Sequence, residues 1–185
     1  YGFGLKTPFF ATLGEHADVT LTPFVTSGGA ILLEGEYRRR YAHGSIDFNS
    51  AFAISEGDGT SGDGYFGIDA KFALRNDLNF FADITFTNDD GFLRRFAFND
   101  ADRLVSKMGV NRYRDTGFLE IGAVFFQSLR DDEVDAEVPF VLPEISYRRT
   151  WEDPVLGGRI GLNIESVGLF RISGRDVFKI GSSLD

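Results

Sequence analysis

Apolar and polar residues alternate with a period of two over much of the chain. Between Gly44 and Ile54, even positions are mostly apolar and odd positions are polar or small. The same alternation recurs from Tyr65 to Arg75 and from Leu78 to Thr87. Successive side chains of a β-strand point to opposite faces, whereas a helix would scatter these apolar residues around its circumference. The pattern therefore predicts strands with one apolar and one polar face.

Turn sequences rich in Gly, Asn and Asp separate these runs, as expected for hairpins. Short turns are predicted at 27–29, 42–44, 75–77 and 114–117, and longer connections at 56–64, 88–101, 130–139 and 152–155. The fold class is therefore all-β, an antiparallel meander of about ten long strands. They are expected at 2–12, 18–26, 30–41, 44–54, 65–75, 78–87, 103–113, 117–129, 140–150 and 157–172.

The predicted strands are longer than the five or six residues usual in globular sheets. They match the 9–11 residues with which a tilted strand crosses a bilayer. Alternating segments of that length are typical of a membrane β-barrel, and the longest uncharged stretch, Val19–Leu33, is too short for a membrane helix. A soluble antiparallel sandwich also alternates and remains the competing interpretation.

Each face of such a wall has its own candidate residues. The lipid-facing set shares even positions: Ile46, Phe48, Phe52, Phe66, Ile68, Phe72, Phe80, Ile84 and Phe86. The lumen-facing polar set is Glu34, Glu36, Arg38, Arg40, Asp47, Asp69, Lys71, Asp83 and Lys107. Arg39 falls on the lipid side, where a midplane Arg costs about 2–4 kcal/mol. We therefore expect Tyr37 and Tyr41 beside it to mark the membrane interface.

Composition removes several classes of chemistry. With no Cys, disulfides, thiolate zinc sites and cysteine nucleophiles are excluded. A net charge of -9 argues against binding nucleic acid through bulk charge. His16 and His43 lie far apart in predicted turns, and the acidic loops lack EF-hand spacing. No enzyme, metal or cofactor is therefore expected, and the acidic loops are interpreted as solvated turns.

Two prolines, Pro8 and Pro23, lie inside the first two predicted strands. Because proline has no N–H for a ladder, it is usually confined to edges, strand starts or bulges. Two prolines in neighbouring strands either protect an edge against unwanted pairing or create a seam that is deliberately weak. The sequence pattern leaves both interpretations open.

Several segments, in order along nearly the whole chain, resemble the barrel of lipopolysaccharide-assembly outer-membrane proteins, the LptD/OstA family. The similar segments are 3–10 (FGLKTPFF), 18–24 (DVTLTPF), 35–38 (GEYR), 88–96 (NDDGFLRRF) and 142–147 (LPEISY). The resemblance implies a very large closed barrel, plugged by a small lipoprotein and fed by a periplasmic bridge protein. Such barrels deliver lipopolysaccharide into the outer leaflet of the bacterial outer membrane.

The resemblance also implies a role for the prolines. In the family the first and last strands meet at a lateral gate, which prolines in the first two strands weaken, and Pro8 and Pro23 match those positions. Residues 1–185 are then expected to form a single β-barrel segment, an excerpt of a longer chain that lacks the periplasmic domain and the remaining strands. The lumen-facing charges would either guide a phosphorylated saccharide or simply fill the interior with ion pairs.

Other functions remain alternatives. A general porin-like or uptake barrel would use the lumen as its route, and the prolines would be incidental. A soluble β-sandwich binding module is a third class, and an outer-membrane lipid hydrolase is disfavoured by the histidine positions. The direction of the strands across the membrane also stays open, because loop lengths and the family resemblance point in opposite directions.

Overall fold

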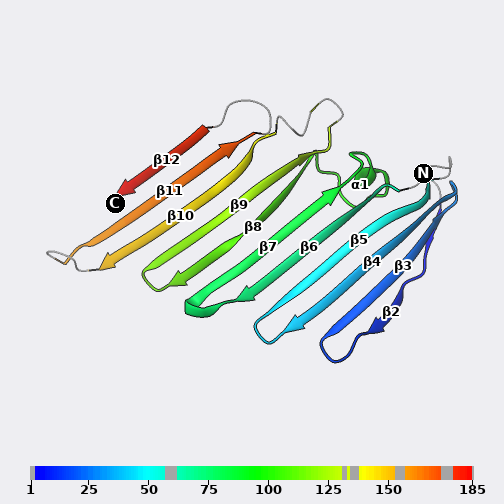
Figure 1. The fold of residues 1–185 in the computed structure, drawn as a ribbon, viewed down its shortest axis with the longest axis horizontal. Coiled ribbons are helices and arrows are strands. Elements are labelled where there is room, and N and C mark those ends of the chain that lie inside the picture. The colour runs from blue at the N-terminus through cyan, green and yellow to red at the C-terminus, as the bar shows by residue number, and fades with distance from the viewer. Residues whose placement is uncertain are drawn as a thin grey trace.

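The computed structural model describes residues 3–56, 62–130, 133, 138–152, 157–171 and 177–184. These residues form one 12-stranded antiparallel sheet in a single layer (Figure 1). Its strands are β1 (Gly4–Lys6), β2 (Phe9–Thr12), β3 (Ala17–Thr26), β4 (Ala30–Tyr41), β5 (Gly44–Glu56), β6 (Gly64–Ala73), β7 (Leu78–Thr87), β8 (Arg103–Arg114), β9 (Gly117–Ser128), β10 (Phe140–Glu152), β11 (Arg159–Phe170) and β12 (Val177–Leu184).

The topology is a meander, in which each strand from β3 onward pairs with the next one along the chain. The N-terminal strands and β12 lie at opposite sides of the sheet (Figure 1), so each side ends in a strand edge. The predicted all-β antiparallel meander is confirmed. Within the described residues there is no second β-layer, and the sandwich interpretation is therefore wrong.

The structure divides the first predicted strand and adds one strand at the C-terminal end. The predicted strand 2–12 is interrupted at Thr7–Pro8, and its halves β1 and β2 both pair with β3. β12 was missed because its sequence alternates over only a few residues before Gly181 and two serines. Pairing with β11 makes this segment a strand, which local pattern could not indicate.

Tight turns join neighbouring strands at the four predicted places, 27–29, 42–44, 75–77 and 114–117. Between β6 and β7 a single 3₁₀ turn, Arg75–Asp77, reverses the chain. Asn76 and Asp77 adopt positive φ angles of 62° and 61° there. Asn and Asp tolerate this left-handed conformation better than most residues, because their short side chains bond locally. The sequence Arg-Asn-Asp therefore suits the turn that the register requires.

The long connection after β7 folds back over one end of the sheet. It contains the one-turn helix α1 (Phe92–Arg95), whose residues Phe92 and Leu93 are 0% and 2% exposed. They pack in a cluster with Ala30, Leu32, Ala51, Ala53, Leu104 and Leu129. Because Leu32 and Ala51 belong to the same face as the predicted lumen charges, one end of that face is apolar and covered.

Asn88 and Asp89, which were expected only to be solvated turn residues, accept hydrogen bonds that hold this connection in place. The Gly64 N–H donates to Asn88 Oδ1 at 2.8 Å, and Arg95 Nη2 donates to Asp89 Oδ1 at 2.6 Å. The other two acidic loops include residues 57–61 and 131–132, which lie outside the described residues. Among the described residues, no helix has the length and apolar character needed to cross a membrane.

Candidate functional site

The strand register separates the two predicted sets of residues onto opposite faces of the sheet. Asp47 lies opposite Asp69, and Asp69 lies opposite Asp83. In the adjacent pair Phe48 lies opposite Ile68, and these two side chains point to the other face of the sheet. We call the face that carries Asp47, Asp69 and Asp83 the polar face, and the face that carries Phe48 and Ile68 the apolar face. All nine predicted lumen residues belong to the polar face, and all nine predicted lipid-facing residues to the apolar face.

A row of charges crosses the polar face at one level. In register from β3 to β8 the row consists of Asp18, Arg38, Asp47, Asp69, Asp83 and Lys107. Carboxylates directly opposite one another repel, and three stand side by side here. Cations offset this repulsion: Arg38 bonds Asp18 and Arg40 bonds Asp47, both at 2.8 Å, and Lys71 reaches the central Asp69 at 3.1 Å.

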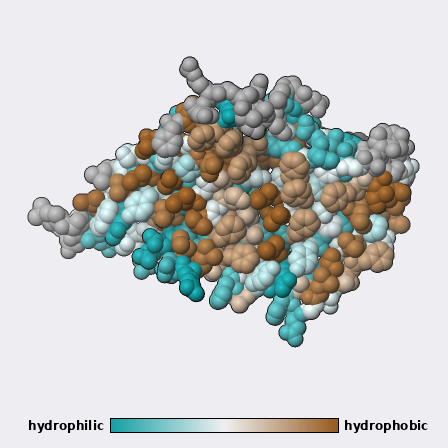
Figure 2. Space-filling model, viewed as in Figure 1, coloured by the Kyte–Doolittle hydropathy of each residue, from teal (hydrophilic) through white to brown (hydrophobic). Residues whose placement is uncertain are grey.

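The apolar face exposes large side chains over the central strands. Phe52 is 50% exposed and Phe86 is 46% exposed, although both lie within paired strands of the sheet. Figure 2 shows one face of the molecule, with hydrophobic residues in a broad zone over the central strands and hydrophilic residues along the lower edge. Soluble monomers rarely leave such an area uncovered.

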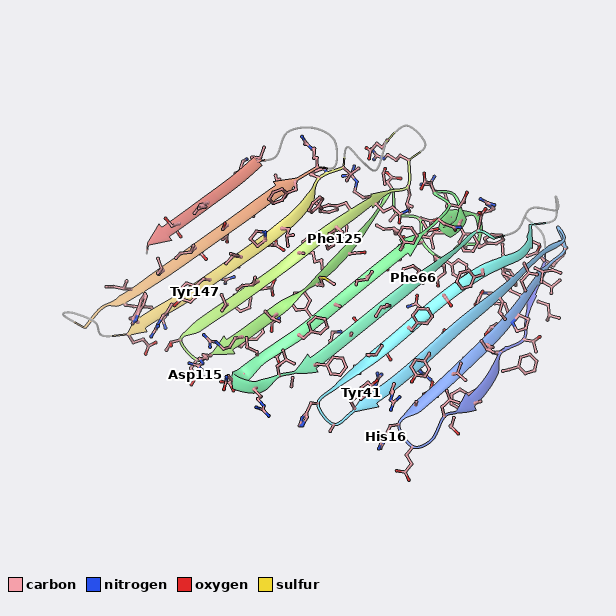
Figure 3. The ribbon with its side chains drawn as sticks, in the orientation of Figure 1. His16, Tyr41, Phe66, Asp115, Phe125 and Tyr147 are labelled. Atoms are coloured by element: carbon pink, nitrogen blue, oxygen red, sulfur yellow. The ribbon has the colours of Figure 1, made fainter. Side chains whose placement is uncertain are left out.

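Arg39 lies on the apolar face, as its position in the sequence predicted, opposite Ile46. Its guanidinium lies 4.9 Å from the centre of the Tyr41 ring, an arrangement that favours the cation electrostatically. Tyr41 ends β4, and Figure 3 places it with His16 and Asp115 along the edge where the hairpin turns gather. His16 and His43 lie in separate turns of that edge. Arg39 is therefore near a strand end rather than mid-strand.

The two prolines lie diagonally across the pairing of the first strand with β3. The common register of β1 and β2 on β3 sets Thr7 opposite Pro23 and Pro8 opposite Thr22. The Thr7 N–H donates to the Pro23 carbonyl at 3.2 Å. In a hydrogen-bonded antiparallel pair the second bond would return from residue 23, and proline has no N–H to make it. Pro23 therefore removes a bond between the first strand and β3.

Pro8 acts on the other side of the first strand. The odd residues of that strand bond β3, as the bonds from Ser27 N to Phe3 O and from Leu13 N to Ala17 O show. In an antiparallel ladder the even residues direct their N–H groups away from that partner. Residue 8 is thus a position whose donor would point to the free edge. Pro23 therefore removes a donor from the ladder with β3, and Pro8 removes one from the free edge of the first strand.

Lys6 ties this edge strand to residues further along the chain, and sequence reasoning missed it. Its Nζ lies 2.5 Å from Glu34 Oε1 and 4.8 Å from the Phe24 ring centre. The Phe98 ring, from the connection that carries α1, is 5.5 Å away. Only the position of Lys6 on the polar face could have indicated the pair with Glu34. The contact with Phe98 depends on how the long connection folds.

The sequence was compared with known proteins. The sequence model of the family described as "LptD: LPS transport system D" matches residues 62–177, more than half of the chain. The chain is also 27% identical, over 159 residues, to "LPS-assembly protein LptD" of Marinobacter nauticus. That match covers 79% of this chain and 20% of the relative. The chain thus spans about a fifth of the length of the curated relative it matches.

Proposed function

Because the chain belongs to the LptD family, LPS transport system D, we propose that it forms part of a β-barrel wall that passes lipopolysaccharide to the outer leaflet of the bacterial outer membrane. The observation that carries this proposal is the single-layer sheet with one charged and one apolar face. The apolar face meets acyl chains, and the polar face lines a hydrated lumen. The remaining strands come from a longer chain and close the barrel, since hydrocarbon offers no partner for an open edge.

The lateral gate lies at the first strand. Each missing backbone bond removes about 0.5–1.5 kcal/mol net, and more where water cannot substitute. Pro23 weakens the pairing of the first strand with β3, and Pro8 weakens its pairing with the closing strand. β3 and β4, by contrast, pair continuously from Ala17 to Val25. The first strand is therefore the element that parts most readily, so that lipid can leave sideways.

The chain acts by pairing its strands into a wall and letting lipid pass, rather than by catalysing a reaction. Lipopolysaccharide is its substrate, and the proposed partners are a plug lipoprotein within the lumen and a periplasmic bridge protein that delivers the lipid. The row of charges from Asp18 to Lys107 supports a water-filled passage on the polar face. Its carboxylates present hydrogen-bond acceptors, and Arg38 and Lys107 present donors, to a sliding saccharide head group.

The double substitution Pro8→Ala with Pro23→Ala in the full-length protein tests the gate. It restores one donor on each side of the first strand, so the seam should tighten and lipopolysaccharide should reach the outer leaflet several-fold more slowly. Export is measured by pulse-labelling lipopolysaccharide and modifying it enzymatically at the cell surface. Pro139→Ala is the control, because Pro139 lies outside the strands. Unchanged export in the double variant would refute the gate.

Crosslinking separates the gate from a general pore. A photoreactive residue replacing Leu5, on the apolar side of the first strand, should capture lipopolysaccharide during export. The same residue replacing Ile68, in the middle of the wall, should capture far less. A porin-like barrel predicts no difference between the two positions, together with solute conductance that falls when Asp69 or Asp83 is replaced by a bulky residue.

A further inference from the structure

The ladder between β7 and β8 ends before the last four residues of β7. The two strands stay in register from Leu78–Arg112 to Asp83–Lys107 and no further. β7 nevertheless continues to Thr87, and β8 begins at Arg103. The backbone groups of Thr85 and Thr87 that point toward β8 therefore need other partners, because unpaired buried groups are costly.

Two side chains take the place of the missing backbone partners. Ser106 Oγ accepts from the Thr85 N–H at 3.0 Å and donates to the Thr85 carbonyl at 3.1 Å. Gln127, from β9, accepts from the Thr87 N–H at 3.2 Å and donates to the Thr87 carbonyl at 2.7 Å. A carboxamide carries the same donor and acceptor as a peptide group. The strands are thus held apart with their polar groups satisfied.

A groove of about 420 Å³ opens where the strands part. Phe66, Ile84, Phe86, Met108, Phe125 and Phe140 are among the residues that line it. Figure 3 shows Phe66 on β6 and Phe125 on β9, on either side of the parted strands. The size falls in the range of small-molecule and cofactor sites. By register Ile84, Phe86 and Met108 belong to the apolar face, so the groove is continuous with it.

The chemistry of the lining selects an apolar occupant. Ser106 and Gln127 are polar, but their side-chain groups are already bonded to β7. Thr85 and Lys107 also line the groove, and both occupy polar-face positions in the register. A polar ligand would therefore find few groups to bind, whereas the methylene groups of an acyl chain would cover the exposed aromatic surface of the groove and remove it from water.

From these contacts we propose that the groove between β7 and β8 binds an acyl chain of a membrane phospholipid. The inference rests on the membrane location proposed above. Four strands, β3 to β6, separate the groove from the edge at β1 and β2 where lipopolysaccharide would leave. The groove therefore suits a lipid that remains beside the wall rather than one in transit. It gives that lipid a preferred place on a face that otherwise contacts bulk lipid.

Quenching of introduced tryptophans tests the groove. Full-length protein carrying Met108→Trp is reconstituted into phosphatidylcholine vesicles with increasing fractions of phospholipid brominated on its acyl chains. Ile121→Trp is the matched control, since Ile121 lies on the same face outside the groove and is 41% exposed, against 37% for Met108. The protein without either change gives the background from native tryptophans. Half-maximal quenching is expected at a several-fold lower brominated fraction for Met108→Trp.

Each outcome decides one claim. Identical quenching curves for the two reporters would overturn the proposal that the groove binds an acyl chain, while leaving the apolar face in the membrane. No quenching at either reporter would contradict the membrane location itself. Relief of quenching at position 108 alone by added lipopolysaccharide would replace the phospholipid with the transported lipid. Should Met108→Trp fail to fold, Phe86→Trp in the groove and Phe52→Trp outside it repeat the comparison, at 46% and 50% exposure.

Discussion

At the scale of single residues, ion pairs at the strand ends hold the connections in place. Glu133, between β9 and β10, accepts hydrogen bonds from Arg103 at 2.7 Å and from the Ser128 hydroxyl at 2.8 Å. Both bonds favour the charged carboxylate, and the bond from Arg103 contributes most. They therefore lower the pKa of Glu133 below its ordinary value. A carboxyl with a lowered pKa makes the stability of the fold depend on pH.

Glu133→Gln should lower the melting temperature of the detergent-solubilised full-length protein at neutral pH and make little difference in acid. The stabilisation is complete above the unfolded pKa of about 4.3 and is lost as the pH falls through the lower folded pKa. Melting curves of both proteins between pH 7 and pH 3 measure the difference. Arg103→Gln should flatten the dependence in the same way. A gap between wild type and Glu133→Gln that stays constant across this range would contradict the assignment.

At the scale of strands, register rather than propensity determines what each side chain does. Ser106 and Gln127 occupy ordinary alternating positions in the sequence. Their role follows from the divergence of β7 and β8, which leaves Thr87 fully buried with ladder groups to satisfy. The same holds for the prolines, whose separate effects depend on which residues of the first strand face β3.

Gln127→Leu should destabilise the protein by about 2–4 kcal/mol, because it leaves the buried N–H and C=O of Thr87 without their partner. The substitution nearly conserves side-chain volume, so the loss reports the hydrogen bonds rather than a cavity. Chemical denaturation of the full-length protein in micelles measures it. Glu120→Leu, in the same strand, is the control, since no described residue makes an ion pair or hydrogen bond with the Glu120 side chain. Equal losses in the two variants would refute the bridging role.

At the scale of the whole molecule, the connection carrying α1 links the middle of the sheet to its first strand. Phe92 and Leu93 lie in the cluster that includes Leu32, and Phe98 packs against it. Lys6 on β1 meets Phe98 and pairs with Glu34. The first strand, which lacks a bond from Pro23 in its ladder with β3, is therefore also held from the polar face by one side chain.

Lys6→Met should loosen the first strand, since it keeps the aliphatic stem but leaves Glu34, only 19% exposed, without its cation. A loss of about 1 kcal/mol corresponds to roughly fivefold faster amide exchange in residues 3–12. Hydrogen exchange followed by mass spectrometry of the full-length protein measures it. Lys71→Met is the control, because its partner Asp69 is 40% exposed. Amide exchange that is unchanged in Lys6→Met would show that the contacts of Lys6 do not stabilise the first strand.

Sequence alone determined most of the strands, their two faces and the tight turns, because alternation and turn chemistry are local properties of the chain, whereas β12 needed its pairing with β11. As neighbours in a strand, Asp47 and Phe48 must point to opposite faces, whatever the rest of the fold does. Only the tertiary structure decided the split at Pro8, the covering of one end of the polar face by α1 and the parting of β7 from β8. Those features depend on pairings between residues up to 92 positions apart, such as Gln127 with Thr87 and Phe98 with Lys6. Such contacts are selected by the packing of the whole sheet, which no local pattern encodes.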